Sequence, residues 1–142
     1  MKMILSIDTS IETASVSLAL NGVLLSYQKN SNQKEHASFV HNAVKLLLSE
    51  SSLDIKKLDA IAIVNGPGSY TGLRVGLSSA KGLCYALNKP LITIGTLNVL
   101  AAAAINSLKE PVRSSALFCP MIDARRMEVY TAVFNDTMTE IL

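Results

Sequence analysis

The stretch whose residue types and spacing best suit a functional site is rich in glycine and joins an apolar run to a helix. It reads GPGSYTGLR from Gly66 to Arg74. Backbone N–H groups and the dipole at a helix start favour phosphate, and Arg74 could add a charge-assisted contact. Two known phosphate signatures do not match, because a Walker loop needs Gly-x4-Gly-Lys-Ser/Thr and the dinucleotide pattern needs glycine where Thr71 stands. The pattern also fits a tight strand-to-helix turn whose third glycine allows close helix packing.

Three other sets of residues could do chemistry, and each also has a structural explanation. Asp8 to Ser10 could hold a phosphate or a magnesium ion, but an aspartate there also satisfies turn amides. His36 and His41 are five residues apart, and no glutamate follows His36 as a zinc-protease helix requires. A nucleophile such as Ser69 can be named, but nothing brings it together with a histidine and an aspartate. From the residues alone, a zinc site and a peptidase therefore have little support, whereas a phosphate or magnesium role for Asp8 to Ser10 stays open.

The composition predicts a folded domain with a sizeable core. Of 142 residues, 49% are hydrophobic and 17% are charged, which excludes intrinsic disorder. The net charge of +2 comes from scattered basic residues, so a strong nucleic-acid surface is not expected. Cys84 and Cys119 each lie in an apolar run, which predicts buried free thiols and a cytoplasmic protein. The longest apolar stretch, Leu97 to Ile105, is well short of the ~18 residues that a membrane span requires.

The first part of the chain predicts three meandering strands. Apolar residues alternate with small polar ones from Ala14 to Leu20, after an apolar run from Met3 to Ile7. Asn21-Gly22 then predicts a two-residue hairpin turn, and Val23 to Lys29 returns as the third strand.

Helices then alternate with apolar strands, which gives the order βββαβαβα. Thr96 is a candidate cap for the last helix. The predicted elements are helices at residues 39–48, 73–87 and 96–105 and buried strands at 60–65 and 91–94.

A polar break separates two units in this interpretation. Residues 1–105 form the first lobe, 106–114 a linker, and 115–142 the start of a second unit with strands at 116–122 and 127–134. Because an isolated hairpin is marginal in water, the second unit must pack on the first, pair with another chain or belong to a truncated domain. We favour truncation.

The first two helices have wider uncharged arcs than a one-sided surface helix needs. The arcs span about 200° and about 220°, against a minimum stripe of about 100°. Glycines inside the second helix, Gly76 and Gly82, indicate close backbone approach there. The arcs predict a partner interface, although packing of the two helices on each other and on the C-terminal segment explains them nearly as well. The predicted interface residues are Phe39, Val40, Ala43, Val44, Leu47, Gly72, Val75, Gly76, Ser79 and Leu83.

Three motifs together closely resemble the TsaB (YeaZ) family: IDTS from Ile7 to Ser10, the glycine-rich stretch, and IDARRMEVY from Ile122 to Tyr130. The likeness runs over essentially the whole chain, and the combination is more specific than any single motif. It implies the actin-like, ribonuclease-H-like ATPase fold, whose first lobe opens with three meandering strands. It also implies a second, similar lobe after about residue 106, most of which this chain would lack.

The resemblance implies a non-catalytic subunit that holds and activates TsaD. TsaD relatives carry a His-x3-His metal motif where this sequence has Asn98 and Ala102. In the family, TsaD transfers a threonylcarbamoyl group to the adenosine at position 37 of tRNAs that read codons beginning with A. TsaE contributes ATPase activity, so ATP is used by the complex and no cofactor is expected on this chain alone. The family places the TsaD contact, and an alternative homodimer, on the first two helices.

The competing interpretation is a small-molecule kinase or ATPase of the same superfamily, with Asp8 to Ser10 and the Gly66 to Gly72 loop around phosphates. The first hairpin lacks the glycine that lets superfamily phosphate loops approach a nucleotide, and half of the cleft would be missing. Such relatives are sometimes called glycoproteases, but this sequence offers no set of catalytic residues for a peptidase.

Overall fold

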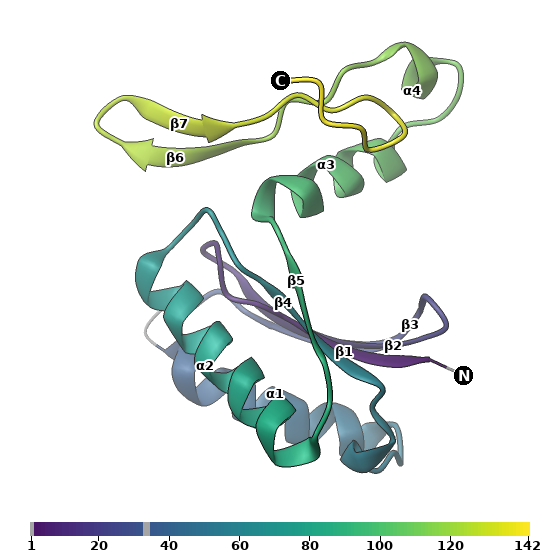
Figure 1. Ribbon diagram of the computed structural model, residues 1–142, viewed down its shortest axis with the longest axis vertical. Coiled ribbons are helices and arrows are strands. Elements are labelled where there is room, and N and C mark those ends of the chain that lie inside the picture. Colours follow the sequence, from purple (N-terminus) through teal and green to yellow (C-terminus); the bar gives the residue numbers. More distant parts are fainter. Residues whose placement is uncertain (1, 33–34) are drawn as a thin grey trace.

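A five-stranded mixed sheet forms the centre of the chain in a computed structural model that describes residues 2–32 and 35–142 (Figure 1). The spatial order of its strands is β3-β2-β1-β4-β5; β4 and β5 run parallel to β1, and β2 runs antiparallel to it. The strands are β1 (Met3–Asp8), β2 (Ala14–Leu20), β3 (Val23–Asn30), β4 (Ala60–Val64) and β5 (Leu91–Ile94).

The first three strands confirm the predicted meander. Buried and half-buried residues alternate along β1 and β2, so one face of each strand enters the core. Asn21 and Gly22 have φ values of 51° and 81°, the positive values at both positions that a type I′ turn requires.

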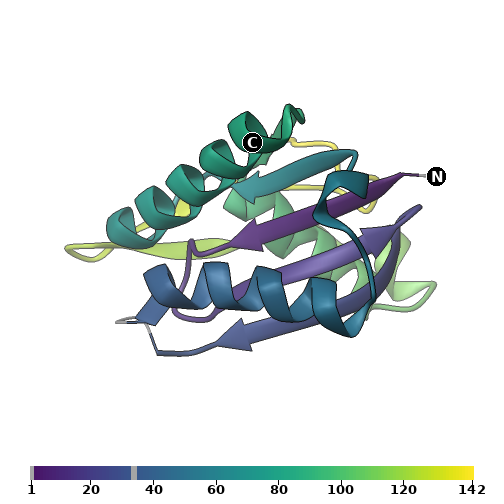
Figure 2. The ribbon, with the colours of Figure 1, turned by 90° about the horizontal axis from the view of Figure 1, so that it is seen from below.

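Two helices cover one face of the sheet and a third lies over the other face. Figure 2 shows α1 (His36–Glu50) and α2 (Tyr70–Leu87) side by side against the strands, and α3 (Thr96–Ser107) follows β5. A short helix, η2 (Ile55–Lys57), precedes β4, and α4 (Val112–Ser115) follows α3. The main core lies between the sheet and the α1–α2 layer. Within residues 2–32 and 35–142, no helix has both the length and the apolar character needed to cross a membrane.

Two local predictions are wrong. β5 was expected to be a buried strand, but Ile92 and Ile94 are exposed, because β5 is the edge strand and only Leu91 packs against the core. Thr96 does not cap α3: Gly95 occupies the N-cap position and Thr96 is the first helical residue.

The C-terminal segment forms a separate two-stranded sheet that shares a small core with α3. The predicted hairpin is present as β6 (Met121–Arg125) and β7 (Glu128–Thr131), both shorter than expected. Phe118 and Phe134 pack with Ala101 and Ile105 of α3. Residues 106–114, the predicted linker, contain the end of α3 and most of α4.

The start of α2 lies directly against the end of β1. Thr9 is fully buried and its hydroxyl donates a 2.7 Å hydrogen bond to the Gly72 carbonyl. A Cβ added at Gly76 would overlap the Thr9 hydroxyl and lie 2.9 Å from Ile63 Cδ1. The absence of side chains at Gly72 and Gly76 is therefore what lets α2 approach the sheet.

We expect Gly76→Ala to destabilise the chain by about 1–3 kcal/mol, because the added methyl overpacks the contact with Thr9 and Ile63. Gly82→Ala is the matched control: a Cβ there meets nothing within 4 Å. That change should stabilise α2 by about 0.5–1 kcal/mol through helix propensity alone. Urea unfolding followed by circular dichroism measures both, and equal stabilities would show that the close approach is not the constraint.

Candidate functional site

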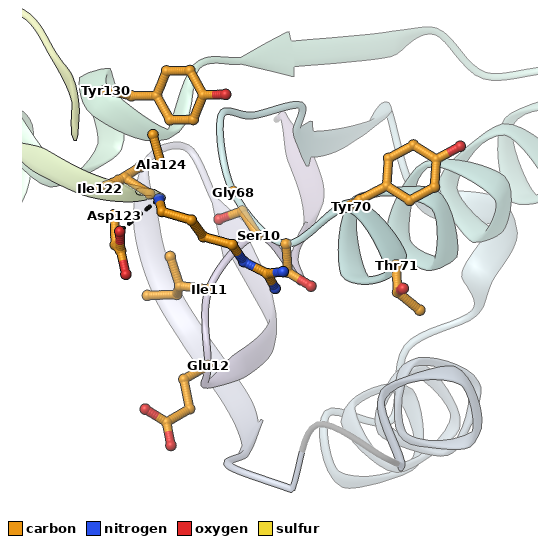
Figure 3. A pocket seen from close by; sticks show the side chains of 12 residues that line it. Ser10, Ile11, Glu12, Gly68, Tyr70, Thr71, Ile122, Asp123, Ala124 and Tyr130 are labelled. Atoms are coloured by element: carbon orange, nitrogen blue, oxygen red, sulfur yellow. Dashed lines mark hydrogen bonds between the residues drawn. The ribbon is translucent and has the colours of Figure 1, made fainter. Parts of the chain in front are cut away.

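The three motifs of the sequence meet around one cavity of about 620 Å³ (Figure 3). The loop between β1 and β2, the start of α2 and the β6–β7 hairpin each contribute one wall. The lining residues are Ser10, Ile11, Glu12, Gly68, Ser69, Tyr70, Thr71, Ile122, Asp123, Ala124, Arg125 and Tyr130.

Hydrogen bonds fix two of these walls to each other. Asp8 Oδ1 accepts from the backbone N–H of Ser10 at 2.9 Å and from its hydroxyl at 2.6 Å. The Ser10 carbonyl in turn accepts from the N–H of Ser69 at 2.7 Å, and the Ser69 hydroxyl caps α2 by accepting from Gly72 N–H at 3.3 Å. Asp8 and Ser69 therefore serve the loop and the helix cap.

Gly68 is required by the closeness of these two walls. Its φ of +156° disfavours a side chain, and a Cβ there would lie 2.9 Å from the carbonyl carbon of Ser10. The tight-turn explanation of the glycine-rich stretch is confirmed at this position.

The cavity combines charges of both signs. Asp123 accepts a 2.7 Å hydrogen bond from the backbone N–H of Arg125, and Glu12 lines the opposite wall. The start of α2 and the Arg125 guanidinium favour an anion, whereas the two carboxylates oppose one. Among the described residues, no histidine or cysteine lines the cavity and no group of three His, Cys, Asp or Glu side chains could hold a metal ion.

Arg74, a candidate anion contact from the sequence, takes another position. Its guanidinium lies over the Tyr70 ring, 5.4 Å from the centroid, and Nη1 donates a 3.1 Å hydrogen bond to the Tyr70 hydroxyl. Because residues four apart are neighbours on a helix, this local pair outcompetes a contact with the loop.

A second candidate site is a groove of about 280 Å³ between α1 and α2. His41 contributes the α1 side, and α2 contributes Ser78, Ser79, Gly82 and Leu83. The space above Gly82 is open, since among the described residues nothing beyond the adjacent helix backbone lies within 4 Å of an added Cβ.

Six of the ten predicted interface residues face the protein's own core, so in this chain they do not line an open surface. They are at most 4% exposed or are glycines packed on the end of β1. The reason is that the sheet covers much of the wide uncharged arc of each helix. These six are Val40, Ala43, Val44, Leu47, Gly72 and Gly76. The other four are half-buried: Phe39, Val75, Ser79 and Leu83.

His41 and Ser78 line the groove and were missed by the sequence prediction, which selected for apolar and small residues. Each is an exposed polar residue beside the boundary between the two helices, so a search for apolar residues at helical spacing does not find it. The side chain of His36 lies outside the described part of the chain.

The two cysteines are free, as predicted, but neither is fully buried. Cys119 is exposed and its sulfur lies 3.2 Å from the Thr131 hydroxyl. Cys84 is half-buried in α2, and this burial raises the pKa of its thiol. The apolar neighbours of Cys119 in the sequence belong partly to an exposed segment, which explains the wrong prediction.

Comparisons with known proteins agree on one family. The TsaD family model, described as tRNA N6-adenosine threonylcarbamoyltransferase, matches residues 25–141. The tRNA threonylcarbamoyladenosine biosynthesis protein TsaB of Bacillus subtilis is 33% identical over 132 residues, which cover 93% of this chain and 55% of that protein. The solved structure of YeaZ from Pseudomonas aeruginosa has a TM-score of 0.83 at 32% identity, and the match covers 95% of this chain and 60% of that one. The chain thus spans little more than half the length of these relatives.

The fold is the actin-like, ribonuclease-H-like α/β fold that was expected. RuvC of Thermus thermophilus, solved with a Holliday junction substrate, has a TM-score of 0.51 at 17% identity, covering 81% of this chain and 85% of that one. This likeness concerns the fold alone.

The two thiols should differ in reactivity at neutral pH. We expect the Cys119→Ser variant, which keeps only Cys84, to react roughly tenfold more slowly with a disulfide reagent than the Cys84→Ser variant. The raised pKa of Cys84 lowers its thiolate fraction, so increasing the pH should narrow the difference. Stopped-flow absorbance measures both rates, and a faster Cys84 would contradict the observed burial.

Proposed function

The chain belongs to the TsaB (YeaZ) group of the family that the TsaD model describes, and from this premise we propose that it acts as a non-catalytic subunit that binds and activates TsaD. Its homologues are named for tRNA threonylcarbamoyladenosine biosynthesis, and the chain takes part in that pathway. In the proposal, TsaD modifies adenosine 37 of the tRNA, TsaE supplies ATPase activity, and the complex works in the cytoplasm.

The open groove over Gly82 is the observation that carries the proposal. A glycine in the middle of a helix costs up to about 1 kcal/mol relative to alanine. Gly76 has an internal reason for this cost, because it lies against Thr9 and Ile63, whereas no other residue that the structure describes occupies the space at Gly82. A partner side chain that enters the groove would supply the reason that the fold does not. Tyr85, 93% exposed on the same helix, adds apolar area beside it.

Residues of α3 support the proposed non-catalytic role. By the family resemblance, Asn98 and Ala102 correspond to the two histidines of the TsaD metal motif, and neither offers an imidazole. A weaker homodimer through the same two helices, which TsaD displaces, is part of the proposal.

Filling the groove should abolish partner binding without unfolding the chain. We expect Gly82→Leu to weaken binding of TsaD from the same organism at least about tenfold, since the added side chain occupies the groove that the partner enters. Ala103→Leu creates the same leucine side chain at an exposed position of α3, on the other side of the sheet, and should bind as wild type does.

Sedimentation velocity of each variant with TsaD measures the affinity, and formation of threonylcarbamoyladenosine by the complete set of proteins measures activation. The proposal is wrong if wild type forms no complex with TsaD. If Gly82→Leu binds normally, the contact lies elsewhere.

The cavity at the glycine-rich loop favours a second candidate, a phosphate-handling enzyme, because it places the start of α2 beside Arg125. The subunit proposal predicts no ATP turnover by this chain alone. Release of phosphate from ATP by the purified chain, abolished by Asp8→Ala, would favour the enzyme. A Glu12→Ala variant controls for general effects on the same cavity.

A further inference from the structure

Exposed cations lie along the outward surface of α1 and α2. On α2, Arg74, Ser78, Lys81 and Tyr85 are all exposed and recur at intervals of three or four residues. This spacing places them along one stripe of the helix. Ser78 lines the groove between the helices, so the two cations of the stripe lie beside that groove.

A third cation lies on the α1 side. Lys45 is exposed and follows His41 by four residues, so it stands one turn further along the side of α1 that borders the groove. The name cationic face is used here for the surface that carries Lys45, Arg74 and Lys81.

Acidic residues do not balance this charge. The sequence of α2 contains no Asp or Glu, and that of α1 contains only Glu50, its last residue. Glu50 is turned toward β3, since its Oε2 accepts a 3.4 Å hydrogen bond from Gln28 Nε2. Arg74 is held in place by its stacking and hydrogen bond with Tyr70. The positive charge of the cationic face is therefore free to interact with a molecule that covers the groove.

We propose that the cationic face selects a protein partner whose contact surface carries acidic side chains around an apolar centre, and that it opposes pairing of two copies of this chain. The inference rests on the function proposed above, because it concerns the same groove. An acidic partner neutralises the three cations as it docks, which raises the association rate and the affinity. A symmetric pair of copies would instead bring six cations into one contact without an acid, and like charges across an interface are costly.

Charge reversal at matched sites tests the proposal. The face variant is Lys45→Glu with Lys81→Glu, and the control variant is Lys56→Glu with Lys57→Glu. Both change the net charge equally, but Lys56 and Lys57 are exposed in η2, outside both helices. Affinity for TsaD is measured at about 0.1 M and about 1 M salt, where the Debye length falls from about 10 Å to about 3 Å.

We expect wild type and the control variant to bind TsaD similarly at low salt and to lose roughly tenfold in affinity at high salt. The face variant should already be at least about tenfold weaker at low salt and should respond less to salt. If TsaD binds wild type but the two variants behave alike, the inference fails while the proposed function stands. If wild type does not bind TsaD under any condition, both fail.

Self-association gives an independent reading on the chain alone. High salt should strengthen any wild-type homodimer, and an equimolar mixture of wild type with the face variant should form mixed dimers more tightly than either protein pairs with itself. A wild-type homodimer that weakens in high salt would overturn the proposed repulsion. Salt-sensitive binding of tRNA by the isolated chain, lost only in the face variant, would identify the cationic face as an RNA surface and overturn the choice of partner.

Discussion

The contact between the end of β1 and the start of α2 determines the rest of the architecture. The Thr9 hydroxyl donates to the Gly72 carbonyl and the Ser10 carbonyl accepts from the Ser69 N–H, so two segments far apart in sequence are joined directly. Gly72 and Gly76 make this approach possible. Once α2 is fixed over the sheet, α1 packs beside it, and the groove between them and the cavity at the loop follow from the same placement.

Much of the fold follows from local patterns. The alternation in β2, the Asn21-Gly22 turn and the helical period of α1 and α2 each depend on short stretches of chain, and each is present as predicted. β5 shows what such patterns cannot predict, because an apolar run of four residues is equally compatible with a buried central strand and with an exposed edge strand. Only the strand order, with no partner beyond β5, leaves Ile92 and Ile94 exposed.

The candidate sites were predictable in part for the same reason. The three motifs converge because each follows a strand or forms a turn at one end of the molecule, which pattern and resemblance could indicate. The partner face was harder, because the width of an apolar arc does not say which neighbour covers it. Gly76 and Gly82 are the same residue type on the same helix, yet one is needed by the core and the other borders open space. That distinction exists only in three dimensions.

α2 connects the two candidate sites mechanically. Its first turn lines the cavity through Ser69 to Thr71, and its outer side lines the groove through Ser78 to Leu83. Closely packed contacts transmit displacement because they leave no free space between the groups. Gly68 and Gly72 make such contacts with backbone atoms of the β1–β2 loop. A ligand or protein that shifted α2 along its axis would therefore have to move the loop between β1 and β2 as well. Gly68 and Gly72, which let the start of α2 pack closely on the β1–β2 loop, therefore also couple the outer surface of α2 to the cavity. A larger side chain at either position would loosen that coupling.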